Sequence, residues 1–201
     1  MFKLSAKRFF TTTHRTMTQF GPISPSLNVP EGAQVTTVGA GCFWGVEHMY
    51  RKYFENKGLI DCRVGYSGGS SDSPDYKTVC SDTTGHAEVL QISFNPDQVT
   101  LNELLDFFFR MHDPTTLNQQ GPDTGSQYRS VVFTHNEEQS RVAREVRDRI
   151  QKEFYPNHKI VTDIVPISVF WDAEDYHQLY LSKNPTGYAC PSHFLRTKPQ
   201  L

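Results

Sequence analysis

The order in which strand-like and helix-like patterns follow one another constrains the fold of this chain most strongly. The patterns, in chain order, are a strand at 34–40, a helix at 43–56, strands at 59–66 and 87–94, a helix at 101–111 and a strand at 130–134. This β-α-β-β-α-β order is typical of an α+β fold, the ferredoxin-like α/β plait. We therefore expect a split βαβ, two-layer sandwich with helices packed on a sheet that contains antiparallel strands.

Two helix starts carry clear capping signals. Thr100 is followed three residues later by Glu103, which predicts a capping box. Asn136 is suited to cap the charged helix expected over 137–154. The chain then continues with a strand at 159–166, a helix near 173–181 and an irregular C-terminal tail rich in proline and glycine.

The N-terminal region differs from the rest in composition. Its first thirty residues include many Ser and Thr, with Lys and Arg but no Asp or Glu. This is typical of a mitochondrial transit peptide, and an unstructured tail is the alternative. We expect 1–32 to be a disordered targeting extension and linker and 33–201 to be one catalytic domain. Localisation would be mitochondrial and/or cytoplasmic, the latter through a second start at Met17.

Composition excludes several classes of function. The net charge is −2 with interspersed signs, so no nucleic-acid or membrane partner is indicated. The apolar run at 104–109 is too short to cross a bilayer. No dinucleotide or P-loop fingerprint and no CxxC pair occurs, which argues against a bound cofactor or zinc. No apolar stripe remains once the core is assigned, and we expect a monomer.

The segment Gly-Cys-Phe-Trp-Gly at 41–45 is the first candidate for chemistry. Cys42 lies at the junction of a strand and a helix, where unpaired N–H groups and the helix dipole favour the thiolate. Phe43 and Trp44 follow it, and the flanking glycines allow another molecule or backbone to come close. Cys42 is thus a candidate nucleophile toward an apolar substrate group. The alternative is a small buried side chain at a helix start.

The remaining cysteines differ in context. Cys62 and Cys80 lie in short apolar or strand-like segments, and we expect both to be inert core residues. Cys190 lies in a segment rich in Gly and Pro, which predicts mobility. A mobile cysteine can resolve a sulfenic acid by forming a disulfide. The alternative is an incidental tail cysteine.

His86 and Glu88 form the second candidate group, two residues apart on a strand and hence on one face. No third residue with suitable spacing completes a metal site. Apolar residues surround Glu88 in the sequence, so an inward-facing carboxyl would lose solvation and keep its proton near neutral pH. A solvent-facing glutamate is the equal alternative.

A third candidate is the polar loop at 123–130. It supplies the Asp123 carboxylate, an amide and the Tyr128 phenol, which together could orient a polar oxygen. Tyr76 lies in another loop of similar type. For each tyrosine, packing with a solvated hydroxyl is the alternative.

Five motifs together resemble the A-type peptide methionine sulfoxide reductases, with a tail like that of fungal members. They are GCFWG, GHAE, GPDTGSQYRS, AEDYHQLY and NPTGYAC. The resemblance implies reduction of the S epimer of methionine sulfoxide in oxidised proteins and peptides, a repair of oxidative damage. It further implies that Cys42 attacks the sulfoxide sulfur while Phe43 and Trp44 hold the S-methyl group.

The same resemblance assigns the other candidates. Glu88 would protonate the sulfoxide oxygen, Tyr76 and Tyr128 would hydrogen-bond it, and Asp123 would orient the site. The resulting sulfenic acid would condense with Cys190, and thioredoxin would reduce the disulfide.

The tail has one cysteine where many bacterial members have two, which implies a cycle without a relay step. A Cys-His hydrolase or acyltransferase and a thiol redox sensor or binding adaptor are the competing functions.

Overall fold

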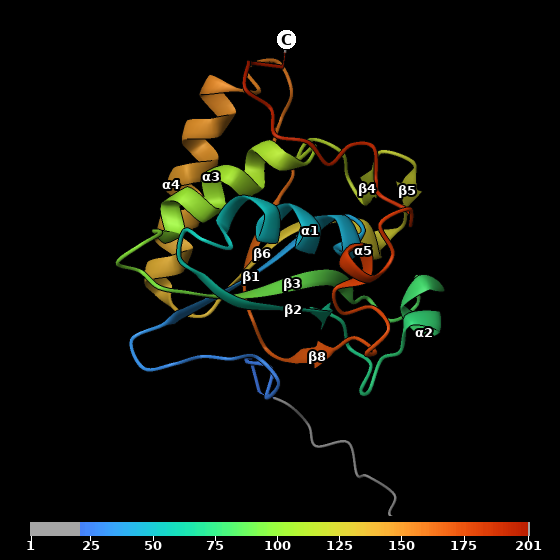
Figure 1. The fold of residues 1–201 in the computed structure, drawn as a ribbon. Helices are drawn as coiled ribbons and strands as arrows, with labels where there is room; N and C mark the ends of the chain where they lie inside the picture. The colour runs from blue at the N-terminus through green and yellow to red at the C-terminus, as the bar shows by residue number, and fades with distance from the viewer. Residues whose placement is uncertain (1–20, 201) are drawn as a thin grey trace, which may run out of the picture.

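The computed structural model describes residues 21–200, and a six-stranded sheet forms its centre (Figure 1). In spatial order the strands are β7 (Asp163–Pro166), β6 (Ser130–Thr134), β1 (Gln34–Ala40), β3 (Ala87–Phe94), β2 (Leu59–Ser67) and β8 (Phe170–Asp172). Neighbouring strands are antiparallel, except that β6 and β7 are parallel. Strand β3 lies between β1 and β2, and β1 lies between β3 and β6. Each βαβ unit is therefore split by a strand of the other, which confirms the ferredoxin-like plait.

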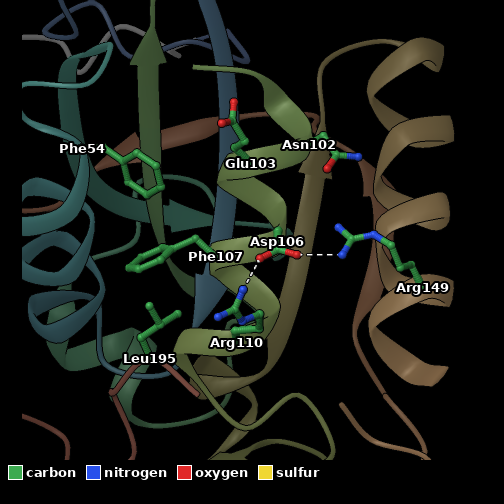
Figure 2. Close-up of a pocket in the computed structure, with 8 residues that line it drawn as sticks. All are labelled: Phe54, Asn102, Glu103, Asp106, Phe107, Arg110, Arg149 and Leu195. Atoms are coloured by element: carbon green, nitrogen blue, oxygen red, sulfur yellow. Dashed lines mark hydrogen bonds and ion pairs between the residues drawn. The ribbon is translucent and has the colours of Figure 1, made fainter. Parts of the chain in front are cut away.

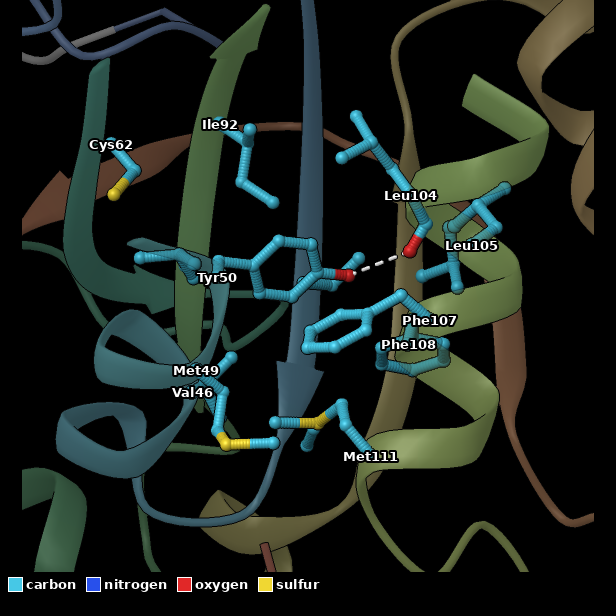
Figure 3. Packing of buried hydrophobic residues seen from close by; sticks show 14 of the residues in the cluster. Val46, Met49, Tyr50, Cys62, Ile92, Leu104, Leu105, Phe107, Phe108 and Met111 are labelled. Atoms are coloured by element: carbon cyan, nitrogen blue, oxygen red, sulfur yellow. Dashed lines mark hydrogen bonds between the residues drawn. The ribbon is translucent and has the colours of Figure 1, made fainter. Parts of the chain in front are cut away.

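One face of the sheet is covered by helices α1 (Phe43–Phe54), α3 (Leu101–Met111) and α4 (Glu137–Glu153) (Figure 1). The main core lies between these layers, and Figure 3 shows Tyr50 in its middle. Tyr50 is fully buried, and its hydroxyl donates to the carbonyl oxygen of Leu104 at 2.9 Å. This bond satisfies a polar group that would otherwise be costly inside the core.

Both predicted helix starts are confirmed. Thr100 Oγ1 accepts a hydrogen bond from the Glu103 N–H, and the Glu103 carboxylate accepts one from the Thr100 N–H. Asn136 accepts a hydrogen bond from the Gln139 N–H at the start of α4. These side chains satisfy N–H groups that have no partner within the helix.

Some short elements differ from expectation. Tyr76 opens a short helix, α2 (Tyr76–Cys80), which a capping box of Asp75 starts, instead of lying in a loop. The prediction of a helix near 173–181 is wrong, because α5 covers only Tyr180–Lys183. Leu179, just before it, has a left-handed backbone with a φ of 57° and interrupts any continuous helix.

The loop between α3 and β6 also contains short elements. They are β4 (Gln119–Gln120), β5 (Asp123–Thr124) and a 3-10 helix (Ser126–Tyr128). Figure 1 shows the β4-β5 pair, α5 and α2 at the same end of the sheet, where α1 begins.

Residues 21–32 differ from the expected disordered linker. The Ser24 N–H donates to Gln91 Oε1 at 2.8 Å, and Gln91 Nε2 donates to the Pro22 carbonyl at 2.9 Å. Gln91 alternates with the core-facing residues of β3, so this segment packs against the opposite face of the sheet. The rest of the predicted targeting extension lies outside the described residues. Within 21–200, no helix is long and apolar enough to cross a membrane.

Candidate active site

Cys42 lies between β1 and the first turn of α1 and is only 7% exposed. Gly41, with a φ of +88°, makes the turn, and a Cβ there would lie 2.6 Å from the Gln120 side chain. A Cβ on Gly45 would meet the imidazole of His193. The two glycines thus admit a close approach, as expected, but it is the chain's own loop and tail that approach.

The protonation state of Cys42 differs from expectation. Burial raises the pKa of the Cys42 thiol well above its ordinary value, and the Glu88 carboxylate raises it further. The backbone N–H groups of Trp44 and Gly45 lower this pKa, as the helix-start argument predicts, but by less. The prediction of a thiolate at rest is therefore wrong. Loss of solvation outweighs the helix start, and the resting group is a thiol.

Glu88 faces inward from β3, on the same side of the sheet as Leu90 and Ile92. It is 1% exposed, and its Oε2 accepts a hydrogen bond from the Phe43 N–H at 3.0 Å. Burial raises the pKa of Glu88 to about 8, although the Phe43 N–H opposes this. The inward-facing alternative is confirmed, and a neutral carboxylic acid stands beside the residue that follows Cys42.

Three tyrosines surround this acid. Tyr76 and Tyr128 come from α2 and the 3-10 helix, and Tyr66 lies directly opposite Glu88 in the β2–β3 register. Burial raises the pKa of each phenol, and the charge of Glu88 contributes to each shift. The structure therefore brings both predicted tyrosines to Glu88 as protonated groups. Tyr66 is a further site residue that was not predicted from the sequence. Its position at the end of the strand expected at 59–66 was the available signal, because this strand pairs with the strand of Glu88.

Aromatic rings form an apolar wall next to the thiol. Phe43 is 1% exposed, and its ring centroid lies 5.9 Å from that of Tyr66. The Trp44 ring stacks on Tyr180 with centroids 3.7 Å apart, and its indole N–H donates to His177 Nδ1 at 2.9 Å. His177 and Tyr180 both lie in the motif AEDYHQLY, but no role was predicted for either residue from the sequence.

Asp123 links the two candidate redox cysteines. Its charge raises the pKa of the thiols of Cys42 and Cys190, although burial is the larger cause for each. One carboxylate oxygen accepts a hydrogen bond from the Tyr188 hydroxyl at 2.8 Å, and the other is buried without a hydrogen-bond partner. That second oxygen retains acceptor capacity for a bound molecule, and the Asp123 side chain also interacts with the Cys190 thiol.

The tail that carries Cys190 is docked, not loose. Cys190 is 3% exposed, and its Sγ lies 3.5 Å from the Gln120 carbonyl oxygen. Further along, the N–H groups of Phe194 and Arg196 donate to carbonyls at the end of α3, at 3.1 and 2.9 Å. These carbonyls have no partner within the helix, which explains why the tail binds there.

The other two cysteines divide. Cys62 is buried in the core, as expected. The core prediction for Cys80 is wrong, because α2 is a short surface helix and leaves this thiol exposed. The Tyr76 hydroxyl is hydrogen-bonded to the Cys80 thiol.

His86 has a structural role in the loop before β3. Its Nδ1 accepts a hydrogen bond from the Gly69 N–H at 3.1 Å, and its Nε2 pairs with the Ser71 carbonyl at 2.8 Å. Within residues 21–200, no group of three His, Cys, Asp or Glu side chains could hold a metal ion.

A cavity of about 440 Å³ lies away from this site, at helices α1, α3 and α4 (Figure 2). Figure 2 shows Phe107 and Leu195 on one side and Asp106 on the other, paired with Arg110 at 2.8 Å and Arg149 at 2.9 Å. None of the candidate residues lines it. The thiol, the acid and the aromatic wall form a separate site near the start of α1.

Comparisons with known proteins agree with this geometry. A family model described as peptide methionine sulfoxide reductase matches residues 34–200. A probable peptide methionine sulfoxide reductase of Schizosaccharomyces pombe is 53% identical over 164 residues, which are 81% of this chain and 96% of the relative.

Two solved structures of Mxr1 from Saccharomyces cerevisiae are also similar. The reduced form has a TM-score of 0.83 at 50% identity, and the match covers 87% of this chain and 99% of the Mxr1 chain. The structure of Mxr1 in complex with Trx2 has a TM-score of 0.62 at 35% identity and covers 87% of this chain and 99% of its own. This chain therefore belongs to the A-type peptide methionine sulfoxide reductase family.

Proposed function

We propose that this enzyme reduces the S epimer of methionine sulfoxide in oxidised proteins and peptides, with Cys42 as nucleophile and Glu88 as acid. The observation that carries these roles is the hydrogen bond from the Phe43 N–H to the buried Glu88 carboxyl, which sets a proton donor next to the thiol. A sulfoxide oxygen leaves only once it is protonated, and a sulfoxide sulfur needs a strong nucleophile. The site supplies both.

The charge of Glu88 influences the ionisation of Cys42. The Glu88 carboxylate opposes ionisation of Cys42, so a thiolate forms while Glu88 holds its proton. The thiolate attacks the sulfoxide sulfur, and Glu88 protonates the oxygen, which Tyr76 and Tyr128 also hydrogen-bond. In sum, one thiol and one sulfoxide become a Cys42 sulfenic acid and methionine. The oxygen and the Glu88 proton end on Cys42 as the sulfenic acid, and the proton released by the thiol returns Glu88 to its acid form.

Epimer selectivity follows from two fixed subsites. Phe43 and Trp44 hold the S-methyl group through sulfur and methyl contacts with aromatic rings, and the acid and phenols hold the oxygen. When the methyl group and the oxygen of the sulfoxide are both held, only one configuration at sulfur directs the rest of the methionine side chain out of the site.

Separate S and R epimers of a blocked methionine sulfoxide test this assignment directly. With dithiothreitol as reductant, we expect methionine formation from the S epimer alone, measured by chiral chromatography. Equal consumption of both epimers would contradict the two-subsite geometry. Turnover of neither would favour a Cys-His hydrolase or a redox sensor, although no histidine in the described residues hydrogen-bonds to the Cys42 thiol.

Cys190 completes the cycle. Its thiol attacks the Cys42 sulfenic acid, forms the disulfide and releases water, and thioredoxin then reduces the disulfide by exchange. Asp123, whose charge acts on both thiols, supports this pairing. The complex of Mxr1 with Trx2 supports thioredoxin as the reductant.

The Cys190→Ser variant should separate the two halves of this cycle. It keeps the first turnover and the dithiothreitol-driven rate, because dithiothreitol reduces the sulfenic acid directly, but it loses thioredoxin-driven turnover. Without reductant, a cyclic 1,3-diketone should trap one sulfenic acid per chain on Cys42, detected by mass spectrometry. Cys80→Ser, at an exposed thiol, is the matched control with unchanged thioredoxin dependence. An unchanged thioredoxin-driven rate in Cys190→Ser would make Cys190 incidental.

A further inference from the structure

Glu174 lies behind the substrate site and contacts the oxygen side of it. One carboxylate oxygen accepts a hydrogen bond from the Tyr76 backbone N–H at 2.9 Å, the first N–H of α2. The other accepts one from the Tyr66 hydroxyl, also at 2.9 Å. A carboxylate at a helix N-terminus satisfies an unpaired N–H and complements the helix dipole. Glu174 thereby fixes where the helix that carries the Tyr76 phenol begins.

The Glu174 carboxylate also lies near His177, which contacts Trp44 on the side of the site proposed to bind the methyl group. The Nε2 atom of His177 lies 3.8 Å from Glu174 and has no hydrogen-bond partner, although the residue is 1% exposed. Its Nδ1 accepts the Trp44 indole N–H at 2.9 Å, which places the ring proton on Nε2, toward Glu174. Burial lowers the pKa of His177, which keeps the ring neutral and Nδ1 able to accept.

The segment that presents these two residues is held by the two residues that directly follow His177. Gln178 donates to the carbonyl of Val64 at 2.8 Å and accepts from its N–H at 3.0 Å, in place of a strand partner. Buried Glu47 on α1 accepts a hydrogen bond from the Leu179 N–H at 2.8 Å. Glu174 and His177 are therefore mounted on a fixed support that bridges β2 and α1.

We propose that Glu174 is a positioning residue that couples the methyl pocket to the oxygen site. It holds Tyr76 through the start of α2 and directs His177, which in turn holds the Trp44 indole. This inference rests on the proposed roles of Trp44 and Tyr76. Loss of Glu174 displaces both subsites at once, so it weakens substrate binding and slows oxygen protonation together.

Steady-state kinetics with the S epimer and dithiothreitol test the coupling. Glu174→Ala should raise KM and lower kcat, with a loss of about 30-fold in kcat/KM. Glu174→Gln separates the two contacts, because its amide oxygen can accept the Tyr76 N–H while its NH₂ replaces the oxygen that faces the His177 Nε2–H. We expect kcat to recover to within about threefold of wild type while KM stays raised. The neighbouring exposed acid offers a matched control, Asp175→Ala, which removes the same charge from the same segment and should leave both constants unchanged.

Tryptophan emission provides a readout that a purely structural role would not move. The chain has two tryptophans, and Trp44→Phe identifies the contribution of Trp44. We expect Glu174→Ala and His177→Phe to shift the emission maximum of Trp44. His177→Asn should retain it, because an amide oxygen can replace Nδ1 as acceptor.

Wild-type constants in Glu174→Ala, or a Trp44 emission unchanged in both Glu174→Ala and His177→Phe, would overturn the coupling. If Glu174→Ala does not fold, Glu174→Gln decides. A raised KM with a shifted Trp44 emission supports the proposal, and a wild-type KM with an unchanged emission opposes it. Absence of turnover in the wild-type enzyme would instead oppose the proposed function.

Discussion

Replacing Cys42 with serine should abolish sulfoxide reduction, a loss of about 10,000-fold or more in kcat/KM. A serine hydroxyl of nearly the same size fits the buried site, but it neither ionises there nor attacks sulfur. Methionine release from the S epimer with dithiothreitol measures the effect. A single-turnover experiment without reductant should give no methionine and no diketone adduct.

The control for this variant is a second buried thiol. Cys62 is 1% exposed in the core, and Cys62→Ala should retain turnover in the folded fraction. If Cys42→Ser keeps more than about a hundredth of wild-type activity while its thermal unfolding matches the wild type, the nucleophile is another group.

Replacing Glu88 with glutamine should slow the reaction by about 100- to 10,000-fold, the usual contribution of a general acid. The amide preserves the shape of the side chain and can still accept the Phe43 N–H, but it cannot transfer a proton to oxygen. Single-turnover rates at pH 7 with saturating S epimer measure the effect. A rate within threefold of wild type would remove Glu88 from the acid role.

The pH dependence gives an independent test. The pKa of Glu88 is raised to about 8, so its acid form is present below that pH and is lost as pH rises through it. The Glu88 carboxylate also opposes ionisation of Cys42, an effect that Glu88→Gln removes. Loss of the acid and suppression of the thiolate therefore both lower the ratio of wild-type to variant kcat/KM as Glu88 ionises. We expect this ratio to be flat below about pH 7 and to fall about tenfold per unit above about pH 8.

The pH dependence of the free energy of unfolding gives a second test of the raised Glu88 pKa. Between an unfolded pKa of about 4.3 and the folded value, the native state binds the extra proton. The free energy of unfolding of the wild type therefore falls, relative to Glu88→Gln, as pH rises across this window. A constant difference between the two proteins would contradict a raised pKa.

Local patterns carried most of the fold. Leu90, Ile92 and Phe94 alternate in β3, and the same parity includes Glu88. Counting in steps of two puts Glu88 on the face of these residues, but the sequence does not show which face of the strand is buried, so the inward-facing and solvent-facing alternatives stayed equal until the fold was known. The caps at Thr100 and Asn136 were readable, because a cap depends on residues within one turn.

The remaining features depend on contacts between distant segments. No local pattern announces that Gln178 pairs with Val64, which keeps 173–179 from forming a helix. The resting state of Cys42 was mispredicted for the same reason. A helix start is a local property, whereas the burial that raises the thiol pKa comes from loops and a tail brought over it in the folded chain.

The burial that keeps the proton on Cys42 also affects how long the enzyme survives. Peroxides oxidise thiolates far faster than thiols, and overoxidation to the sulfinic state is irreversible for most proteins. In the proposed cycle Cys42 ionises with substrate bound and Glu88 still protonated, and the thiolate attacks as Glu88 gives its proton to the sulfoxide oxygen. The resting enzyme is thus chemically quiet toward the oxidants that create its substrate, and the damaged methionine itself switches its reactivity on.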